Sequence, residues 1–260
     1  MRLKALIFDV DGTLADTEEA HRNAFNDAFA AAGLAWHWNA ALYQDLLRVA
    51  GGKERIAHFI GTLQIDEAEK ARLRARVPAL HADKTQRYAQ RVAHGQVVLR
   101  TGIARLVTEA RMAGVRLALA TTTSPQNVDA LIGATLGAGA LDWFASRVCG
   151  DAVAAKKPSP EVYLRALSEL GLRAQDCVAL EDSANGLRAA LGAGLCTVVT
   201  PTQWSAGDDL AGAALVIPHL GDAQCPLDGR DAARVGAPCL GLAAIERLRT
   251  ECANALEATI

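Results

Sequence analysis

The chain has 260 residues, of which 51% are hydrophobic and 22% are charged, and its formal net charge at pH 7 is −2. This is the composition of an ordinary globular protein with enough apolar residues for one large core or two smaller ones. Acidic and basic residues are mixed along the chain and form no basic stripe or tail, which argues against a nucleic-acid partner. A small-molecule partner fits this charge pattern better, and we expect a monomer.

The N-terminal apolar segment stops at Asp9, so it is too short for the core of a signal peptide, and no stretch is long enough to span a bilayer. The cysteines are scattered and form no CxxC pair: Cys149, Cys177, Cys196, Cys225, Cys239 and Cys252. Such spacing is typical of reduced thiols in a core rather than of disulfides or zinc ligands. We therefore expect a cytoplasmic protein with no membrane partner.

Short apolar runs predict strands in chain order, and segments of helical character lie between the later runs. Alternation of strands and helices predicts βαβ units in a mainly parallel sheet, and continuously apolar strands predict helices on both faces. The fold class is therefore α/β, with a Rossmann-like parallel-sheet core. The predicted strands are Leu3–Val10, Val115–Thr121, Arg147–Cys149, Cys177–Leu180, Cys196–Thr200 and the shorter Leu215–Ile217.

The interval 15–92 interrupts this alternation, because it is nearly all helical in pattern and contains no strong strand. A crossover helix needs far fewer residues, which indicates an all-helical domain inserted after the first strand. Residues 1–14 and 93–222 would then form the α/β core. Residues 223–260 begin as a loop and end in a predicted helix, Leu240–Ala258, that we expect to pack on the core.

Two carboxylates, Asp9 and Asp11, stand at the end of the first predicted strand. Side chains alternate along a strand, so both point the same way, and the carboxyl ends of parallel strands face the crevice where such sheets bind ligands. Two carboxylates this close need a cation, or one of them must hold a proton. The pair therefore favours a nucleophile and metal ligand beside a general acid and base, although a strand end with two solvated aspartates remains an alternative.

Three later segments carry groups that suit a phosphate and a metal ion. Thr121, Thr122 and Thr123 offer hydroxyls and amides to phosphate oxygens. Lys157 supplies a positive charge before a predicted helix, and a solvated loop lysine is the ordinary alternative. The adjacent acids Glu181 and Asp182 suit a hard cation with oxygen ligands, although Asp182 is also a plausible helix N-cap.

In this order, these residues resemble the four motifs of the haloacid dehalogenase-like superfamily, over residues 5 to about 200. The resemblance implies that Asp9 attacks phosphorus and forms an aspartyl-phosphate, while Asp11 protonates the leaving alcohol and then deprotonates water. It implies that Thr121 and Lys157 hold the phosphoryl oxygens. It also implies that Mg²⁺ is bound by Asp9, the backbone carbonyl of Asp11, and Asp182, with Glu181 as an inner- or outer-sphere ligand.

The second acid distinguishes branches of this superfamily. Its dehalogenases lack an aspartate at the position of Asp11, so phosphate chemistry is implied here. The helical insertion resembles the cap of the branch that contains β-phosphoglucomutase, phosphoglycolate phosphatase and phosphonatase. Such caps close over the substrate, set specificity and exclude water. On the cap we expect Glu18 and His21 to contact substrate, although Glu54 stands where the mutase has a phosphate-binding arginine.

The chain is most similar to the CbbY-type phosphatases associated with Calvin-cycle gene clusters, through Phe8–His21, Gly51–Ile56, Ala120–Ser124, Lys156–Pro160 and Leu180–Gly186. The implied substrate is xylulose 1,5-bisphosphate, an inhibitor of Rubisco. The cap loop would grip its remote phosphate and sugar hydroxyls. The expected substrate-binding residues are Asp9, Glu18, His21, Gly51, Gly52, Lys53, Glu54, Arg55, Thr121, Thr122, Thr123 and Lys157.

Four alternatives stay open at this point. The substrate is 2-phosphoglycolate, or the enzyme is β-phosphoglucomutase-like, or it is a phosphonatase in which Lys53 forms a Schiff base with an aldehyde. The remaining alternative is a catalytically silent metabolite-binding regulator on the same scaffold. Such a regulator would be expected to lack a catalytic acid or the lysine, and this chain has them all.

Overall fold

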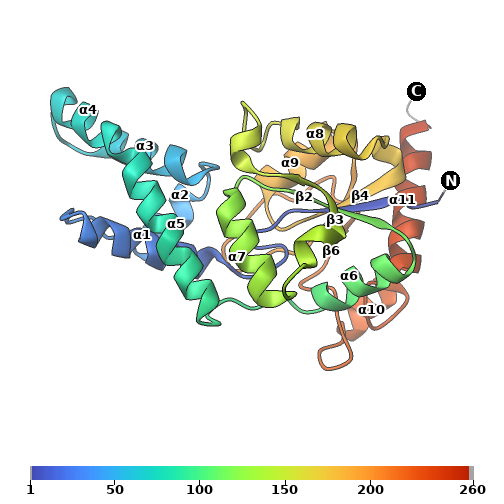
Figure 1. The fold of residues 1–260 in the computed structure, drawn as a ribbon. Helices are drawn as coiled ribbons and strands as arrows, with labels where there is room; N and C mark the ends of the chain where they lie inside the picture. The colour runs from blue at the N-terminus through green and yellow to red at the C-terminus, as the bar shows by residue number, and fades with distance from the viewer. Residues whose placement is uncertain (1, 258–260) are drawn as a thin grey trace.

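A computed structural model describes residues 2–257 and contains a six-stranded sheet whose strand pairs are all parallel (Figure 1). Its order is β3-β2-β1-β4-β5-β6, so the first strand lies at the centre of the sheet. The strands are β1 Ala5–Phe8, β2 Arg116–Ala120, β3 Phe144–Val148, β4 Cys177–Glu181, β5 Cys196–Val199 and β6 Leu215–Val216. The predicted α/β class with a parallel sheet is confirmed.

The edge strand β3 begins three residues before the predicted Arg147, because it does not have the apolar pattern of the inner strands. Phe144, Ser146 and Val148 are buried, whereas the alternate residues Ala145 and Arg147 are exposed. The inner strands β1 and β4 are buried at every position, as expected for strands covered on both faces.

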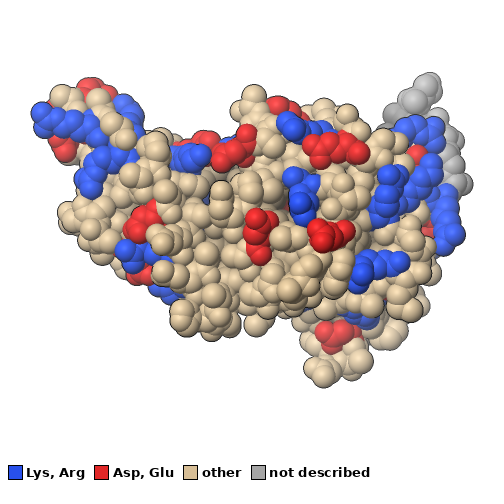
Figure 2. Space-filling model, in the orientation of Figure 1, with Lys and Arg blue, Asp and Glu red and all other residues tan. Residues whose placement is uncertain are grey.

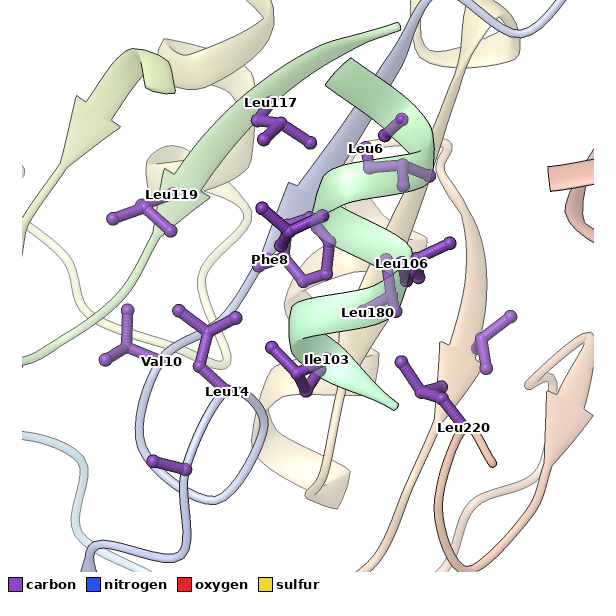
Figure 3. Packing of buried hydrophobic residues seen from close by; sticks show 14 of the residues in the cluster. Leu6, Phe8, Val10, Leu14, Ile103, Leu106, Leu117, Leu119, Leu180 and Leu220 are labelled. Atoms are coloured by element: carbon purple, nitrogen blue, oxygen red, sulfur yellow. The ribbon is translucent and has the colours of Figure 1, made fainter. Parts of the chain in front are cut away.

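Helices cover both faces of the sheet and build an apolar cluster on each. On one face pack α6 (Ile103–Met112), α7 (Pro125–Thr135) and α11 (Leu242–Glu257); on the other pack α8 (Glu161–Leu170) and α9 (Ala184–Gly192). Figure 3 shows the first cluster, in which Phe8 of β1 lies beneath α6 and Leu119 of β2 lies to one side of that helix. The short 3₁₀ helices are Ala140–Trp143, Gly150–Ala152 and Ala174–Asp176.

A separate group of helices, α1 to α5, lies to one side of the sheet (Figure 1). These are α1 Glu18–Ala31, α2 Ala40–Leu46, α3 Gly52–Thr62, α4 Glu67–Ala75 and α5 Val77–Ala93. They enclose an aromatic cluster of their own that includes Phe25, Phe29, Trp38 and Tyr43. The first four fall within residues 15–92, for which we propose the role of an inserted cap, and α5 ends one residue beyond that interval, at Ala93.

The two chain crossings between cap and core lie side by side. Ala15 forms an antiparallel bridge with Leu99, and the Arg100 amide donates to the carbonyl of Leu14 at 2.9 Å. The Arg100 guanidinium also donates to the Gly12 carbonyl at 2.5 Å, in the turn that follows the first strand. The two linkers between cap and core are therefore bonded to each other and to the turn that carries Asp11.

The C-terminal segment packs on the core through α10 (Gly229–Val235) and α11. Val235, Leu240 and Ile245 are buried in the cluster that also covers β1 and β5. The predicted helix Leu240–Ala258 begins two residues late, at Leu242, and its last predicted residue lies outside the described part of the chain. No helix among residues 2–257 is long and apolar enough to cross a membrane.

Candidate active site

A cavity of about 610 Å³ lies at the carboxyl ends of the strands and is lined by both core and cap. This volume is in the range of small-molecule sites. Among the predicted site residues, those that line it are Asp9, Asp11, Glu18, His21, Gly51, Gly52, Lys53, Arg55, Thr121, Thr122, Thr123, Lys157, Glu181 and Asp182. Parallel strands end at one edge of the sheet, and for this reason motifs far apart in the chain meet here.

Lys157 is the centre of the buried charges at this edge. Its Nζ donates to Asp9 Oδ1 at 2.7 Å and to Glu181 Oε1 at 2.6 Å, and the Tyr163 hydroxyl donates to the same Glu181 oxygen at 2.5 Å. Burial disfavours the ammonium form, but the charges of Asp9 and Glu181 raise the pKa of Lys157 above its ordinary value. Lys157 therefore stays charged and keeps the Asp9 carboxylate in one orientation.

Asp9 is 6% exposed and lies among several charges. Burial raises its pKa to about 7, with the charges of Glu181 and Asp11 adding to this effect and Lys157 opposing it. A carboxylate in this position is destabilised in the absence of further positive charge. The site therefore favours the binding of a cation.

Asp9, Glu181 and Asp182 fit a magnesium ion by donor type and spacing. Each offers a carboxylate oxygen, these atoms lie within 4.8 Å of one another, and all three residues are buried. Burial, followed by the charges of Asp9 and Glu181, raises the pKa of Asp182 well above its ordinary value. Oxygen donors with excess negative charge are the ligands that Mg²⁺ prefers.

Glu181 differs from the other two acids because both of its oxygens already accept hydrogen bonds. Oε1 accepts from Lys157 and Tyr163, and Oε2 accepts from the backbone amide of Asp182 at 3.2 Å. An outer-sphere role, holding the groups around the ion, suits this geometry better than direct ligation.

Gly12 allows Asp182 to approach the turn after the first strand. It has a φ of +83°, in the left-handed region, and a Cβ atom there would lie 2.2 Å from Asp182 Oδ2. A side chain at position 12 would thus displace one of the acids of the proposed metal site.

Asp11 is oriented by a chain of hydrogen bonds that leads into the cap. Its Oδ1 accepts from the Thr17 hydroxyl at 2.7 Å and lies 2.9 Å from His21 Nε2, while Lys84 Nζ lies 2.7 Å from His21 Nδ1. The Lys84 ammonium can only donate, so Nδ1 accepts and the His21 proton resides on Nε2, which donates to Asp11.

The pKa values along this chain keep Asp11 ionised. Burial raises the pKa of Asp11, but His21, Thr17 and Lys84 together bring it below its ordinary value. Burial and the nearby Lys84 charge lower the pKa of His21, so the imidazole is neutral. The same burial lowers the pKa of Lys84 to about 8.

The hydroxyl cluster after β2 lines the floor of the cavity. The backbone amide of Thr123 donates to Thr121 Oγ1 at 3.2 Å, and Asn127 Nδ2 donates to Thr123 Oγ1 at 3.0 Å. Ser124 accepts from the Asn127 amide and so caps α7, whose N-terminal end faces the same cavity. Helix N-termini and hydroxyls favour phosphate oxygens.

On the cap side, Tyr43 joins two of the predicted substrate-binding residues. Its hydroxyl donates to Glu18 Oε2 at 2.7 Å and accepts from Arg55 Nη1 at 3.1 Å. Arg55 also donates through Nε to the Leu46 carbonyl at 3.2 Å. Arg55 therefore already holds part of the cap in place, besides lining the cavity.

Two ion pairs connect the cap loop to the core. Lys53 lies 3.3 Å from Asp151, and Glu54 lies 3.0 Å from Lys156. In Figure 2, basic and acidic side chains meet at the upper edge of the boundary between cap and core. Glu54 does not line the cavity, so its expected contact with sugar hydroxyls stays a prediction.

Sequence reasoning missed Lys84 and His81, which line the cavity, and Tyr43, which bonds to the lining residues Glu18 and Arg55. Lys84 had a detectable signal: it is the one charged residue in the buried stripe of α5, beside Val77, Leu80, Tyr88 and Val92. A lysine inside an apolar stripe is rarely buried without a partner, so its position alone suggests a functional contact. Tyr43 and His81 had no comparable signal, because their contacts depend on how the cap helices pack together.

Comparisons with known proteins agree with this geometry. A sequence model of the family described as haloacid dehalogenase-like hydrolase matches residues 3–194. The protein named CbbY, plasmid, from Cupriavidus necator is 56% identical over 225 residues, covering 86% of this chain and 89% of that protein. Protein CbbY from Rhodobacter capsulatus is 52% identical over 220 residues, covering 85% and 95%.

Among solved structures, an aspartate-to-asparagine mutant of CbbY from Rhodobacter sphaeroides in complex with xylulose 1,5-bisphosphate is 46% identical and has a TM-score of 0.79. The match covers 85% of this chain and 98% of that one. The chain therefore belongs to the haloacid dehalogenase-like hydrolase family and to its CbbY-type group, and it is a phosphatase.

Proposed function

We propose that this protein is a Mg²⁺-dependent phosphatase of xylulose 1,5-bisphosphate that works through an aspartyl-phosphate on Asp9. The observation that carries the proposal is one cavity that contains Asp9, Asp11 and the other acids of the proposed metal site and is also lined by the cap residues Lys53, Arg55 and Lys84. The similarity to a CbbY crystallised with xylulose 1,5-bisphosphate supports this substrate.

The core residues would bind and orient the reacting phosphate. Asp9, Asp182 and the Asp11 carbonyl would hold Mg²⁺, with Glu181 in the outer sphere, and the bound ion would neutralise phosphoryl charge. Lys157 and the hydroxyl of Thr121 would hold further phosphoryl oxygens. A bound cation would also offset the unfavourable burial of the Asp9 and Asp182 carboxylates described above.

In the first step, an oxygen of Asp9 forms a bond to phosphorus while the bond from phosphorus to the sugar oxygen breaks. Asp11 gives its proton to the departing alkoxide. Asp11 is ionised in the free enzyme, so it must take up this proton from solvent when substrate binds. The incoming dianionic phosphate favours that change, because negative charge nearby raises the pKa of a carboxyl group.

In the second step, Asp11 is ionised again and takes a proton from water, whose oxygen attacks phosphorus and releases Asp9. His21 and Thr17 orient the Asp11 carboxylate through the hydrogen bonds described above. The cap excludes bulk water, so that the first phosphoryl acceptor is Asp9.

A bisphosphate suits the cap because basic side chains line the cavity beyond the reacting centre. Lys53, Arg55, Lys84 and Lys156 all face it. A second phosphate held there supplies binding energy that can be spent on closing the cap and aligning the attack. We accordingly propose a small phosphorylated metabolite as the partner.

The free state of all six cysteines supports a reducing compartment such as the cytoplasm.

The test is phosphate release under one set of conditions from xylulose 1,5-bisphosphate, xylulose 5-phosphate, ribulose 1,5-bisphosphate and 2-phosphoglycolate. We expect the highest kcat/KM for xylulose 1,5-bisphosphate. A clear preference for 2-phosphoglycolate would move the protein to the phosphoglycolate phosphatase branch. Conversion of β-glucose 1-phosphate to glucose 6-phosphate would indicate a mutase, and release from no substrate would favour a silent regulator.

The phosphonatase alternative has a separate test. Borohydride in the presence of phosphonoacetaldehyde would trap a Schiff base at a cap lysine. In the structure Lys53 pairs with Asp151, whereas Lys84 is a buried cap lysine with a lowered pKa. The labelled peptide must therefore be identified, to show which of the two lysines reacted. We expect no labelling and no inactivation.

A further inference from the structure

The loop after β5, residues 200–208, belongs to the core but reaches the cap. The ring of Trp204 lies edge-to-face against that of Tyr43, with centroids 5.6 Å apart and an interplanar angle of 87°. Trp204 also packs against the aromatic cluster of the cap and lines the cavity. A core side chain thus completes the apolar interior of the cap.

The same loop is tied to the proposed metal site. The Ser205 hydroxyl donates to the backbone carbonyl of Asp182 at 2.7 Å, and the Ala184 amide donates to Asp208 Oδ2 at 2.7 Å. Ser205 is buried, and its Oγ also accepts from the Thr202 amide at 3.0 Å. The position of Trp204 is therefore set by the segment that carries Asp182.

On the cap side, Trp204 contacts the residue that orients Glu18 and Arg55. Both side chains bond to the hydroxyl of Tyr43, whose ring lies against Trp204. The ion pair between the cap and core residues Lys53 and Asp151 is more exposed: their side chains are 43% and 58% exposed, and an ion pair so open to water is weakened by salt. The Trp204–Tyr43 contact is apolar and does not depend on salt in this way.

We propose that Trp204 is the core residue that positions the closed cap, and with it Glu18 and Arg55, over the reacting phosphate. This inference rests on the proposed function. It makes Trp204 a positioning residue for sugar substrates, acting through Tyr43 rather than through the phosphoryl group. The ring is what matters, because the buried Trp204 Nε1 has no hydrogen-bond partner in the structure.

The kinetic test compares Trp204→Ala and Trp204→Phe with the wild-type enzyme on xylulose 1,5-bisphosphate and on p-nitrophenyl phosphate. Trp204→Ala should lower kcat/KM for the bisphosphate at least tenfold and for the aryl phosphate much less, since the latter needs neither Glu18 nor Arg55. Trp204→Phe should restore most of the loss. Trp143→Ala, which removes a partly buried tryptophan packed on Arg111 in the core, is the matched control and should preserve the ratio.

Hydrogen exchange gives a second readout that does not depend on the substrate. With Mg²⁺ and inorganic phosphate present, the amides of α2 around Tyr43 should exchange faster in Trp204→Ala than in the wild type, and Trp143→Ala should leave them unchanged. This comparison remains valid even if no sugar phosphate is hydrolysed, which would overturn only the proposed function. Equal losses on both substrates, or unchanged exchange in α2, would overturn the role of Trp204.

Discussion

The core and cap sides of the cavity are built in different ways. Asp9, Lys157 and Glu181 are at most 6% exposed and hold one another through hydrogen bonds shorter than 3 Å. On the cap, Lys53 is half-exposed and is held only by an ion pair with Asp151. Buried, paired charges are preorganised for one reaction, whereas exposed ones can be rearranged at little cost. The core is therefore suited to chemistry, and the exposed cap loop that carries Lys53 to selectivity.

The largest effect on activity is expected from a change that affects the core side alone. Removal of divalent metal with a chelator should abolish turnover of every substrate, because Asp9 and Asp182 then lack the charge that offsets their burial. Added Mg²⁺ should restore the rate. Phosphate release from p-nitrophenyl phosphate measures this directly, and full activity in metal-free buffer would refute the metal assignment.

The Asp11→Asn substitution should cause the second-largest loss of turnover. General acid–base catalysis contributes about 10²–10⁴-fold, and the amide can neither give nor take the proton. Because nitrophenolate leaves without a proton, the first step should suffer least with the aryl phosphate. Stopped-flow comparison of the two substrates checks this. Near wild-type turnover of a sugar phosphate by this variant would contradict the acid–base role, and Asp142→Asn, an exposed change outside the cavity, is the control.

The Lys84→Met substitution tests whether this cap residue controls the pH dependence of the reaction on the core side. The wild-type rate should fall as pH rises through about 8, where Lys84 loses the charge that orients His21. In the variant this fall in rate at alkaline pH should be absent. Its rate below pH 8 should be about tenfold lower than that of the wild type, since hydrogen bonds to charged groups contribute about 1.5–3 kcal/mol. An unchanged alkaline limb would exclude Lys84 as its source, and Lys70→Met on α4 controls for charge loss.

The titration of Lys84 should have the opposite effect on the stability of the fold, which should rise with pH. The pKa of Lys84 is 10.5 in the unfolded chain and about 8 in the folded one, so between these values the unfolded state binds more protons. The cost of burying this charge should therefore diminish as pH rises through that window. Chemical denaturation at pH 7 and pH 9 would show a smaller pH dependence in Lys84→Met.

Lys53→Ala should have the smallest effect. It should reduce the preference for the bisphosphate over xylulose 5-phosphate by about fivefold, the equivalent of ~1 kcal/mol for an exposed ion pair. Hydrolysis of p-nitrophenyl phosphate should hardly change, since Lys53 lies on the cap. The ratio of the two kcat/KM values is the readout. An unaltered ratio would remove Lys53 from the remote phosphate site.

The sequence was more informative about the core than about the cap. Asp9, Lys157 and Glu181 were expected to meet because parallel strands end at one edge of a sheet, and the side chains do lie together. The contact between Tyr43 and Trp204 joins a cap helix to a core loop and depends on tertiary packing, which no local pattern encodes. The edge strand β3 begins earlier than its apolar run predicts, because two of its five residues, Ala145 and Arg147, face water.

The most direct test of the account is detection of phosphate on Asp9. Asp11→Asn is mixed with p-nitrophenyl phosphate and Mg²⁺, quenched in acid within milliseconds, and digested for mass spectrometry, with Asp9→Asn treated in the same way. We predict a peptide carrying one phosphoryl group on Asp9 in Asp11→Asn, and none in Asp9→Asn. Turnover by Asp9→Asn, or a phosphoryl group on another residue, would contradict the assignment of Asp9 as the nucleophile.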